Sequence, residues 1–507
     1  MDVSDFTSSS LPPETFRDTV SPRDSQVLVD AEKELNEISK EGILANAYNS
    51  PEALRSPIHR LPPEILTKIF AINCVGARLA FAGGIGMPDV FSISQVCRRW
   101  REILLFTPSF WSDFQMYYPE NKGQQAGIAR MTRLFLERSK NVPLTLMFLV
   151  PWETPWRAEK PDHLSLLVES AERWKNVDMI VEDFFHPFFR LLSERRLGLC
   201  SLQSLELKCG IDGPKFLIVP LNVFERCASL VSVRLNDLSS EWRSLRLPWK
   251  QLTRLQVCRI NSLDLIPLLG ECPRLRDLTL EACSLSDTPG GRTTSWATST
   301  MITLPHLETL SMPDCDHIPD LLGHLTLPRL SFLRFQDSQS DLAVREMERI
   351  VEFLHRSACT ITQLAFQPPG STSGIGPGVE EIVSFLCLFP SLQTLSLEPV
   401  RYRHFEKIPY DEIDAIVTVL VVLASAALPR LEELIIDARK RPVRVLEHLC
   451  AVVEEDQRVI TSLRGLIIWI ESSRRASEQD LESLRRLREV GVRMDIVRYH
   501  HRRSGAR

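Results

Sequence analysis

The chain has 507 residues, of which 44% are hydrophobic and 25% charged, and its formal net charge is −5. This length accommodates several domains or one long repeat array, and the composition is that of an ordinary folded protein. So small a net charge gives the chain as a whole no electrostatic attraction to nucleic acid or to an anionic membrane.

The cysteines and the apolar segments indicate the cellular compartment of the chain. The twelve cysteines include no Cys-x-x-Cys pair and follow no regular spacing. No charged segment followed by an apolar one opens the chain, so we expect no secretory signal. We therefore expect the chain to lie in a reducing compartment, the cytoplasm or the nucleus, and its cysteines to be free, buried thiols. The most apolar run, Ala415–Leu428, is shorter than the roughly 20 residues that cross a bilayer, so we interpret it as a buried helix and expect no membrane partner.

The N-terminal residues form two segments of different character. Residues 1–24 are rich in Ser, Thr, Pro and Asp and predict a disordered N-terminus. In residues 25–48, an apolar stripe predicts an amphipathic helix through Leu28, Ala31, Leu35 and Ile38. The stripe is too short for a coiled coil, so packing back on the chain and a weak self-contact remain alternatives.

Two amphipathic helices are expected next. The first begins at Pro62 and Pro63, since prolines fit the first turn of a helix, where an N–H group has no partner. The second begins near Asp89, a plausible N-cap, and ends before Pro108. Between them, residues 76–88 are rich in glycine and predict a loop. That loop lacks the Lys-Ser or Lys-Thr of a phosphate-binding motif, so a flexible connection is the better interpretation.

Three phrases in order carry a family resemblance, namely LPPEILTKIF (61–70), VCRRWREI (96–103) and TPSFW (107–111). They resemble the F-box, especially that of the F-box-like proteins abundant in mushroom-forming fungi, and identify residues 57–115 as an F-box-like helical domain. The resemblance implies binding to a Skp-type adaptor and, through it, to a cullin scaffold. The implied adaptor-binding residues are Leu61, Pro62, Ile65, Leu66, Ile69, Phe70, Val96, Cys97 and Trp100.

The physical argument for a docking face is that these apolar side chains lie on a unit too small to cover them. The alternative is that the same residues are buried against the rest of the chain. Trp111, in the third phrase, is expected to pack the small unit against the repeats that follow.

The remainder of the chain is repetitive. The phrase LxxLxL, with Val, Ile, Met or Phe allowed, recurs with its first position at Leu202, Leu230, Leu252, Leu275, Leu307, Leu330, Ile361, Leu392, Leu431 and Leu463. Alternate apolar positions bury one face of a short strand, and leucine-rich repeats recur every 20–29 residues or so. The fold class is therefore α/β, in which the small helical F-box-like domain is followed by an irregular leucine-rich-repeat solenoid with a curved parallel sheet.

Helical segments are expected between the strands, at Leu263–Leu269, Val344–Leu354, Val379–Leu386, Ile413–Leu428, Val445–Val452 and Leu481–Leu487. The solenoid is assigned to residues 140–498. Its irregular start contains strands at Val142–Val150 and from Trp174, and its last strand is expected at Val490–Ile496. Residues 499–507 are a basic tail with little aromatic interleaving and no binding motif, so we interpret them as solvated and expect no nucleic-acid partner.

The strands of the solenoid predict a surface for a second partner. Side chains between the buried positions point to the concave face, where we expect an unknown protein substrate to bind. Their chemistry is mixed and slightly basic, which favours an acidic partner. The candidate substrate-binding residues are Arg234, Arg254, Gln256, Arg276, Thr279, Arg334 and Gln363.

No catalytic motif is recognisable. The chain has no nucleophile elbow, Walker phrase or HExxH motif, so we expect no enzyme, no catalytic residue and no cofactor. Asp314–His317 lack a second pair of ligands at metal-site spacing, and we expect no metal. Cys283 and Cys315, at equivalent repeat positions, are expected to be structural.

The sequence thus predicts a non-catalytic substrate receptor of a Skp–cullin–F-box ubiquitin ligase, with the adaptor on the F-box and the target on the repeats. A scaffold that takes no part in ubiquitin transfer is one alternative. A repeat protein with its own small-molecule pocket is another.

Overall fold

The structure is a computed structural model. It describes residues 57–74, 77–79, 89–117, 122–149, 162–181, 191–193, 198–209, 222–237, 245–260, 262–283, 301–337, 344–366, 384–397, 428, 430–437, 465–471, 482, 485–486 and 494–499. The predictions for residues 1–24, 25–48, 415–427 and 500–507 lie outside these ranges. The chain divides into two compact units. Unit 1 is residues 1–140 with 161–166, and unit 2 is residues 141–160 with 167–507.

Unit 1 begins with the predicted helices, and the second of them is divided. A short 3₁₀ turn, η3 (Pro57–Arg60), precedes α2 (Pro63–Asn73), which starts directly after Pro62. The second predicted helix is two helices, α3 (Asp89–Ser94) and α4 (Arg98–Phe106). The backbone is extended at Cys97, with φ of −160°, and the Arg101 side chain donates a hydrogen bond to the Ser94 carbonyl that ends α3.

The predicted loop over residues 76–88 is wrong for its first part, because Ala77–Leu79 form strand β1. This strand pairs in parallel with β2 (Asp113–Tyr117), so backbone pairing overrides the local glycine content. The last unit 1 helix is α5 (Lys122–Ser139), which follows β2.

An aromatic cluster forms the core of unit 1 around Trp111, which lies in the 3₁₀ turn η4 (Pro108–Trp111). Its indole nitrogen donates a 2.8 Å hydrogen bond to the Leu104 carbonyl. The rings of Phe91 and Phe135 lie 5.7 and 5.0 Å from the Trp111 ring, and the Arg138 guanidinium lies over it at 4.9 Å. Trp111 was expected to pack against the repeats. In the structure its ring contacts Phe135 and Arg138 of α5, within unit 1.

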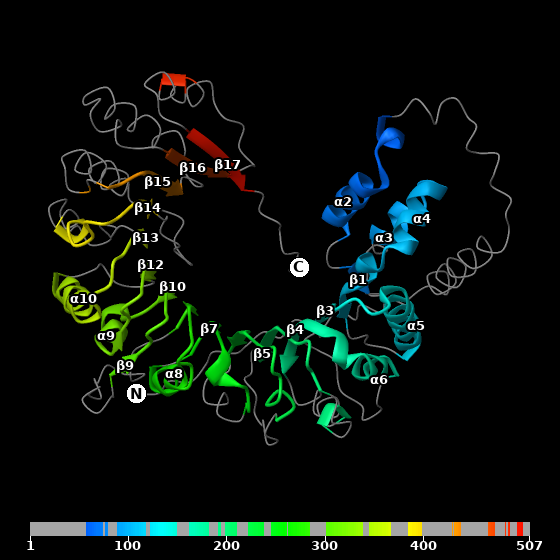
Figure 1. The fold of residues 1–507 in the computed structure, drawn as a ribbon, viewed down its shortest axis with the longest axis horizontal. Coiled ribbons are helices and arrows are strands. Elements are labelled where there is room, and N and C mark those ends of the chain that lie inside the picture. Colours follow the sequence, from blue (N-terminus) through cyan, green and yellow to red (C-terminus); the bar gives the residue numbers. More distant parts are fainter. Residues whose placement is uncertain are drawn as a thin grey trace, which may run out of the picture. The chain divides into compact units, whose positions relative to one another are not determined.

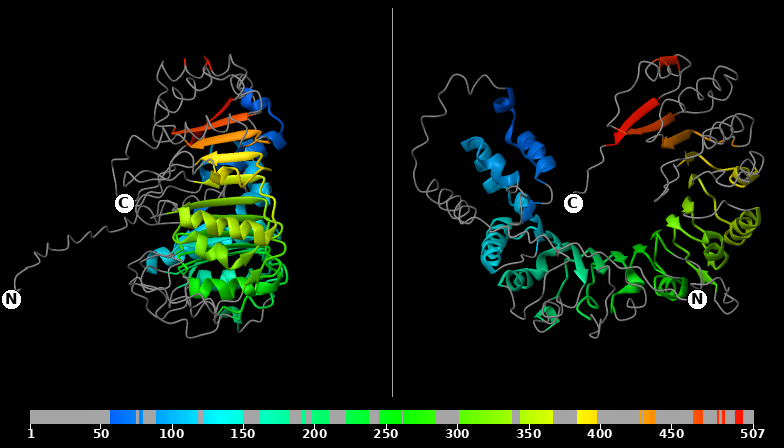
Figure 2. Two further views of the ribbon diagram at one scale, coloured as in Figure 1. Left: turned by 90° about the vertical axis from the view of Figure 1, so that its left-hand side faces the viewer. Right: turned by 180° about the vertical axis from the view of Figure 1, so that it is seen from behind.

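Unit 2 is a curved parallel sheet with its strands in repeat order (Figures 1 and 2). Its strands are β3 (Leu144–Leu149), β4 (Trp174–Val181), β5 (Ser204–Cys209), β6 (Ser232–Asn236), β7 (Arg254–Cys258), β8 (Asp277–Glu281), β10 (Thr309–Cys315), β12 (Phe332–Asp337), β13 (Gln363–Phe366), β14 (Thr394–Leu397), β15 (Glu433–Asp437), β16 (Gly465–Glu471) and β17 (Met494–Tyr499). The predicted early strands are confirmed as β3 and β4. The predicted last strand corresponds to β17 from Met494 on, and residues 490–493 lie outside the described ranges.

Equivalent positions of the repeat phrase are paired across this sheet. The second leucine of each phrase pairs with its counterpart in the next strand, as in Leu255 with Leu278, and Leu278 with Leu310. These side chains are buried, and so are the first leucines, which precede each strand. The predicted leucine-rich-repeat solenoid is confirmed, and alternate residues are buried along β6, β7, β8 and β14.

Helices lie on the outer side of the curved sheet, as Figures 1 and 2 show for α8 (Ser262–Gly270), α9 (Ile318–Gly323) and α10 (Val344–Ser357). Two of them, α8 and α10, are predicted correctly, whereas α9 is not expected from the sequence. Helix α6 (Asp162–Glu169) and the 3₁₀ turn η5 (Ala171–Arg173) lie between β3 and β4 in the chain. The 3₁₀ turn η8 (Trp249–Gln251) lies between β6 and β7. A small second sheet pairs β9 (Ile302–Thr303) with β11 (Leu325–Thr326).

The same turn follows three neighbouring strands. Asp237, Arg259 and Ala282, directly after β6, β7 and β8, have φ of 58°, 56° and 50°. Their N–H groups donate to the next strand, as from Arg259 to the Glu281 carbonyl at 2.9 Å. The left-handed turn therefore continues the ladder of hydrogen bonds at the end of each strand, at some conformational cost because none of the three is glycine.

Within the part of the chain that is described, no helix combines the length and the apolarity needed to cross a membrane.

Candidate functional site

Helix α2 presents two apolar faces, and only one of them is exposed. Leu66 and Phe70 are 0% and 2% exposed and belong to the core of unit 1. Ile65, Ile69 and Ile72 lie along another side of the helix, because residues three and four apart share a face. The exposed fractions of Ile65 and Ile72 are 40% and 78%, and Ile69 is half-buried.

Trp100 of α4 supports the buried face of α2. Its ring lies 4.8 Å from that of Phe70, at an interplanar angle of 58°. The Arg99 guanidinium donates a 2.6 Å hydrogen bond to the Leu61 carbonyl, just before α2 begins. These two contacts hold α2 and α4 together. They explain why Leu66 and Phe70 are inside the unit.

Two further apolar side chains of unit 1 face solvent. Val96, before α4, is 57% exposed, and Phe106, at the end of α4, is 76% exposed. We refer to Ile65, Ile69, Ile72, Val96 and Phe106 as the exposed apolar set. A contiguous row of exposed apolar side chains, such as Ile65, Ile69 and Ile72 along α2, is typical of a surface that binds a partner.

The nine residues predicted to bind the adaptor therefore divide into three groups. Pro62, Ile65 and Val96 are exposed; Leu61, Ile69, Cys97 and Trp100 are half-buried; Leu66 and Phe70 are buried. Ile72 and Phe106 are exposed residues that the sequence analysis missed. Ile72 had a clear signal, since it lies three residues after Ile69, which lies four residues after Ile65.

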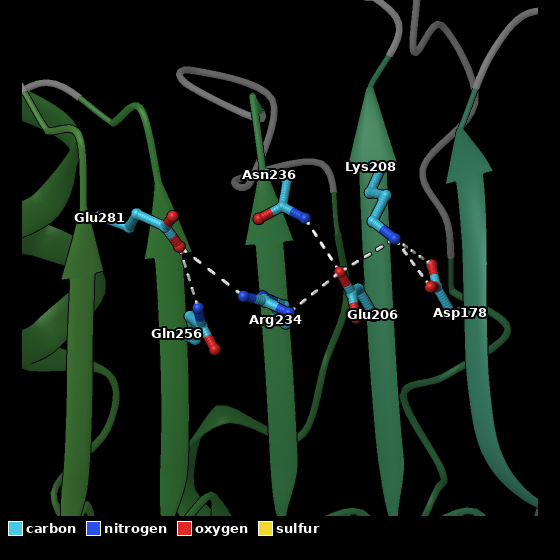
Figure 3. Close-up of polar contacts among 7 residues, drawn as sticks. All are labelled: Asp178, Glu206, Lys208, Arg234, Asn236, Gln256 and Glu281. Atoms are coloured by element: carbon cyan, nitrogen blue, oxygen red, sulfur yellow. Dashed lines mark hydrogen bonds and ion pairs between the residues drawn. The ribbon is translucent and has the colours of Figure 1, made fainter. Parts of the chain in front are cut away.

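The concave side of unit 2 carries a connected row of polar side chains across β4 to β8, drawn in Figure 3. The Lys208 ammonium lies 2.7 Å from Asp178 Oδ2 and 3.1 Å from Glu206 Oε1. Arg234 lies between Glu206 and Glu281, with nitrogen to oxygen distances of 3.5 and 3.7 Å.

Two neutral amides join the same carboxylates. Asn236 Nδ2 donates to Glu206 Oε1 at 3.1 Å, and Gln256 Nε2 donates to Glu281 Oε2 at 3.2 Å. We call these residues the polar row, which comprises Asp178, Glu206, Lys208, Arg234, Asn236, Gln256 and Glu281. Burial raises the pKa of the Asp178 carboxyl above its ordinary value, although the hydrogen bond from Lys208 opposes the shift.

The structure places the seven predicted substrate-binding residues at three kinds of position. Register pairs Arg234 with Gln256 and Gln256 with Thr279, and continues through Ser311 to Arg334. Arg254 and Gln363 begin their strands, one row away. Arg276 precedes β8, outside the sheet, and its guanidinium lies 3.9 Å from the Glu308 carboxylate.

The concave face over β4 to β8 is not basic, contrary to the expectation from the sequence. Glu206 and Glu281 each lie within 4 Å of the Arg234 guanidinium, and Asp178 pairs with Lys208. The sequence analysis chose candidates among the arginines and amides and overlooked these carboxylates. Glu206 had a signal, since it lies between the last two leucines of a repeat phrase.

Five described cysteines are buried, as expected of structural thiols, whereas Cys200 and Cys387 are exposed; the buried ones are Cys74, Cys227, Cys272, Cys283 and Cys315. Cys283 and Cys315 are 1% and 0% exposed, and the Cys315 thiol donates to the Leu280 carbonyl at 3.3 Å. Burial raises the pKa of the Cys272 thiol to about 12, far from the range of a reactive thiolate. Among the residues that the structure describes, no three His, Cys, Asp or Glu side chains are grouped so that they could hold a metal ion.

Residues 58–115 match the family model described as F-box-like. This F-box-like region contains α2, α3, α4, η4 and the whole exposed apolar set. No curated protein matches the chain. Among solved structures, the chain is similar to the leucine-rich repeat-containing protein LegL7 from Legionella pneumophila, with 13% identity and a TM-score of 0.35 over 63% of this chain and 93% of that chain.

Proposed function

We propose that the chain is a substrate receptor of a Skp–cullin–F-box ubiquitin ligase. The F-box-like region binds a Skp-type adaptor, which connects it to a cullin scaffold, and the repeats of unit 2 hold a target protein. In this role the chain is a non-catalytic subunit of the cytoplasm or nucleus, and other subunits transfer the ubiquitin.

The observation that carries the proposal is the exposed apolar set, which lies within the residues that match the F-box-like family. The Ile72 and Phe106 side chains are more than three quarters exposed. Full burial of such a side chain contributes about 1.5–3 kcal/mol, so two or three of them can dominate the affinity of an interface.

The buried residues among the nine predicted ones have a supporting role in this proposal. Leu66 and Phe70 contact the interior of unit 1 and hold α2 against α4. Pro62, Ile65, Ile69, Val96 and the rim of Trp100 are left to contact the adaptor directly, joined by Ile72 and Phe106. The SPIHRLPPEIL phrase before and within α2 supports a relationship to the fungal F-box-like proteins.

The experiment is reconstitution of the complex from purified components. The intact chain is mixed with a Skp-type adaptor and a cullin, and the mixture is separated by size-exclusion chromatography. Elution of all three together is the expected result, and elution of the chain alone would overturn the proposal. A ubiquitination assay on proteins captured by the repeats then separates a ligase receptor from a scaffold that binds the adaptor without ubiquitin transfer.

A further inference from the structure

Helix α2 has a row of apolar side chains that the described residues of unit 1 leave uncovered. The row consists of Ile65, Ile69 and Ile72, and the exposed fractions of its first and last members are 40% and 78%. It is roughly 10 Å long, at a rise of about 1.5 Å per residue. The exposed Lys68 lies beside the row, three residues after Ile65, whereas Glu64 lies further round the helix. A matching partner therefore has an apolar stripe of at least this length with negative charge beside it.

The chain carries such a stripe a short distance before α2. Residues 25–48, which lie outside the described ranges, have the apolar residues Leu28, Ala31, Leu35 and Ile38 at the spacing of one helix face. These four residues span roughly 15 Å of a helix, enough to cover the α2 row. A single helix of this length is only marginally stable in water, so it needs an apolar surface to pack on.

Charge distinguishes the two surfaces that this stripe could pack on, a second copy of itself or the rest of its own chain. Residues 25–48 contain five acids and two bases, so two copies would repel each other. The F-box-like region, residues 58–115, contains six bases and four acids and has a net charge of the opposite sign. Electrostatic complementarity therefore favours contact with the F-box-like region over self-association.

The connection between the two segments is long enough for this contact. Residues 49–56 connect the stripe to η3, and eight residues can span up to roughly 28 Å. Helix α2 has 11 residues and is therefore roughly 16 Å long. The segment can thus turn back and lie along α2. So short a connection also gives the segment an effective concentration in the millimolar range at this row.

We infer that the apolar stripe of residues 25–48 packs on the α2 row within the same chain. The inference rests on the proposed function, since the row belongs to the exposed apolar set that an adaptor would bind. The segment then competes with the adaptor and keeps the row out of water while no adaptor is bound. A contact between two stripes this short corresponds to a dissociation constant in the millimolar range or just below it, so the row is covered in about half to nine-tenths of the molecules.

The first test is photo-crosslinking in the intact chain without an adaptor. The photoreactive residue benzoylphenylalanine replaces Ile72, which keeps the row apolar, and mass spectrometry identifies the residues it attaches to. We expect crosslinks to residues 25–48 within a single chain. The matched control carries benzoylphenylalanine in place of Ala71, an exposed residue on another side of α2, and should lose these crosslinks.

The second test places charges in the stripe. The double variant Leu28→Asp with Leu35→Asp should lose the crosslinks from position 72. It should also bind a purified Skp-type adaptor about two- to tenfold more tightly than the parent chain, since the row is then uncovered in every molecule. The control Gln26→Asp with Asn36→Asp adds the same charges on another side of the predicted helix and should behave like the parent chain.

The two tests separate this inference from the proposed function. Absence of crosslinks to residues 25–48, crosslinks that join two chains, or crosslinks that persist in Leu28→Asp with Leu35→Asp would each overturn the inference. Adaptor affinity that is equal in this variant and the parent chain would also overturn it. Absence of adaptor binding by every variant and by the parent chain contradicts the proposed function, and the crosslinks, which are measured without an adaptor, still decide whether the segment packs on α2.

Discussion

At the scale of single residues, the two apolar faces of α2 have different physical roles. Leu66 fills the interior of unit 1, whereas Ile72 is 78% exposed. Truncation of a buried leucine loses its transfer free energy and leaves a cavity, at a cost of about 2–5 kcal/mol. Truncation of an exposed isoleucine changes stability by about 0.5 kcal/mol or less.

We therefore expect Leu66→Ala to lower the opening free energy of α2 by about 2–5 kcal/mol, and Ile72→Ala to leave it nearly unchanged. Hydrogen exchange of the α2 peptides in the intact chain, followed by mass spectrometry, measures this difference. Similar protection of α2 in both variants would show that Leu66 is not a core residue.

The turn residue Ala282 gives a second prediction at this scale. Its φ of 50° is in the left-handed region, which costs a residue with a Cβ about 1–2 kcal/mol. Glycine removes this cost but adds chain entropy to the unfolded state, which offsets about 0.5–1 kcal/mol of the gain. Ala282→Gly should therefore raise the stability of the repeats by up to about 1 kcal/mol. Denaturant unfolding of the intact chain measures the shift, and a loss of stability would contradict this account of the turn.

At the scale of elements, α5 is an integral part of unit 1. Phe135 of α5 lies 5.0 Å from Trp111 and 5.3 Å from Phe114, and it is fully buried. The family match ends at residue 115, before this helix. A fragment that ends there would leave the Trp111 ring uncovered.

We expect residues 57–140 to fold as a separate fragment and residues 57–115 not to do so. Near-ultraviolet circular dichroism, which detects fixed aromatic side chains, distinguishes the two fragments. The variant Phe135→Ala in the longer fragment should cost about 3–5 kcal/mol, as expected for a buried phenylalanine. A shorter fragment with the same aromatic signal as the longer one would show that α5 is dispensable.

The elements differ in how well the sequence predicts them, and the reason is physical. Each repeat phrase specifies its strand, because a leucine at every second position permits only one buried face. The apolar steps Ile128, Met131 and Phe135 also signalled α5, although the sequence analysis did not use them. For α2, the sequence shows Ile65, Leu66, Ile69 and Phe70 together, and these residues cover two adjacent sides of a helix. Which side is inward depends on Trp100, far along the chain.

The polar row shows a similar limit. Glu206 could be placed on the concave face from its repeat phrase, but Asp178 lies in a strand without one. Pairing of the carboxylates with Lys208 and Arg234 follows from the register between strands, which single phrases do not specify. The sequence therefore predicted which side chains of a repeat phrase lie on the concave face, but not how their charges are paired.

At the scale of the whole molecule, the account assigns a separate binding task to each unit. In the proposed function, unit 1 presents the exposed apolar set to an adaptor, and unit 2 presents its concave face to a target. Because the two tasks use different side chains, a substitution in one surface should leave binding at the other unchanged.

The most direct test is the affinity of the intact chain for a purified Skp-type adaptor, measured by isothermal titration calorimetry. We predict that Ile72→Asp weakens binding by at least about thirtyfold, since it places a charge among the exposed apolar side chains that the adaptor would bury. The control Ala71→Asp adds the same charge to an exposed position on another side of α2 and should bind like the parent chain. Unchanged affinity of Ile72→Asp, or no binding by the parent chain, would contradict the claim that this face holds the adaptor.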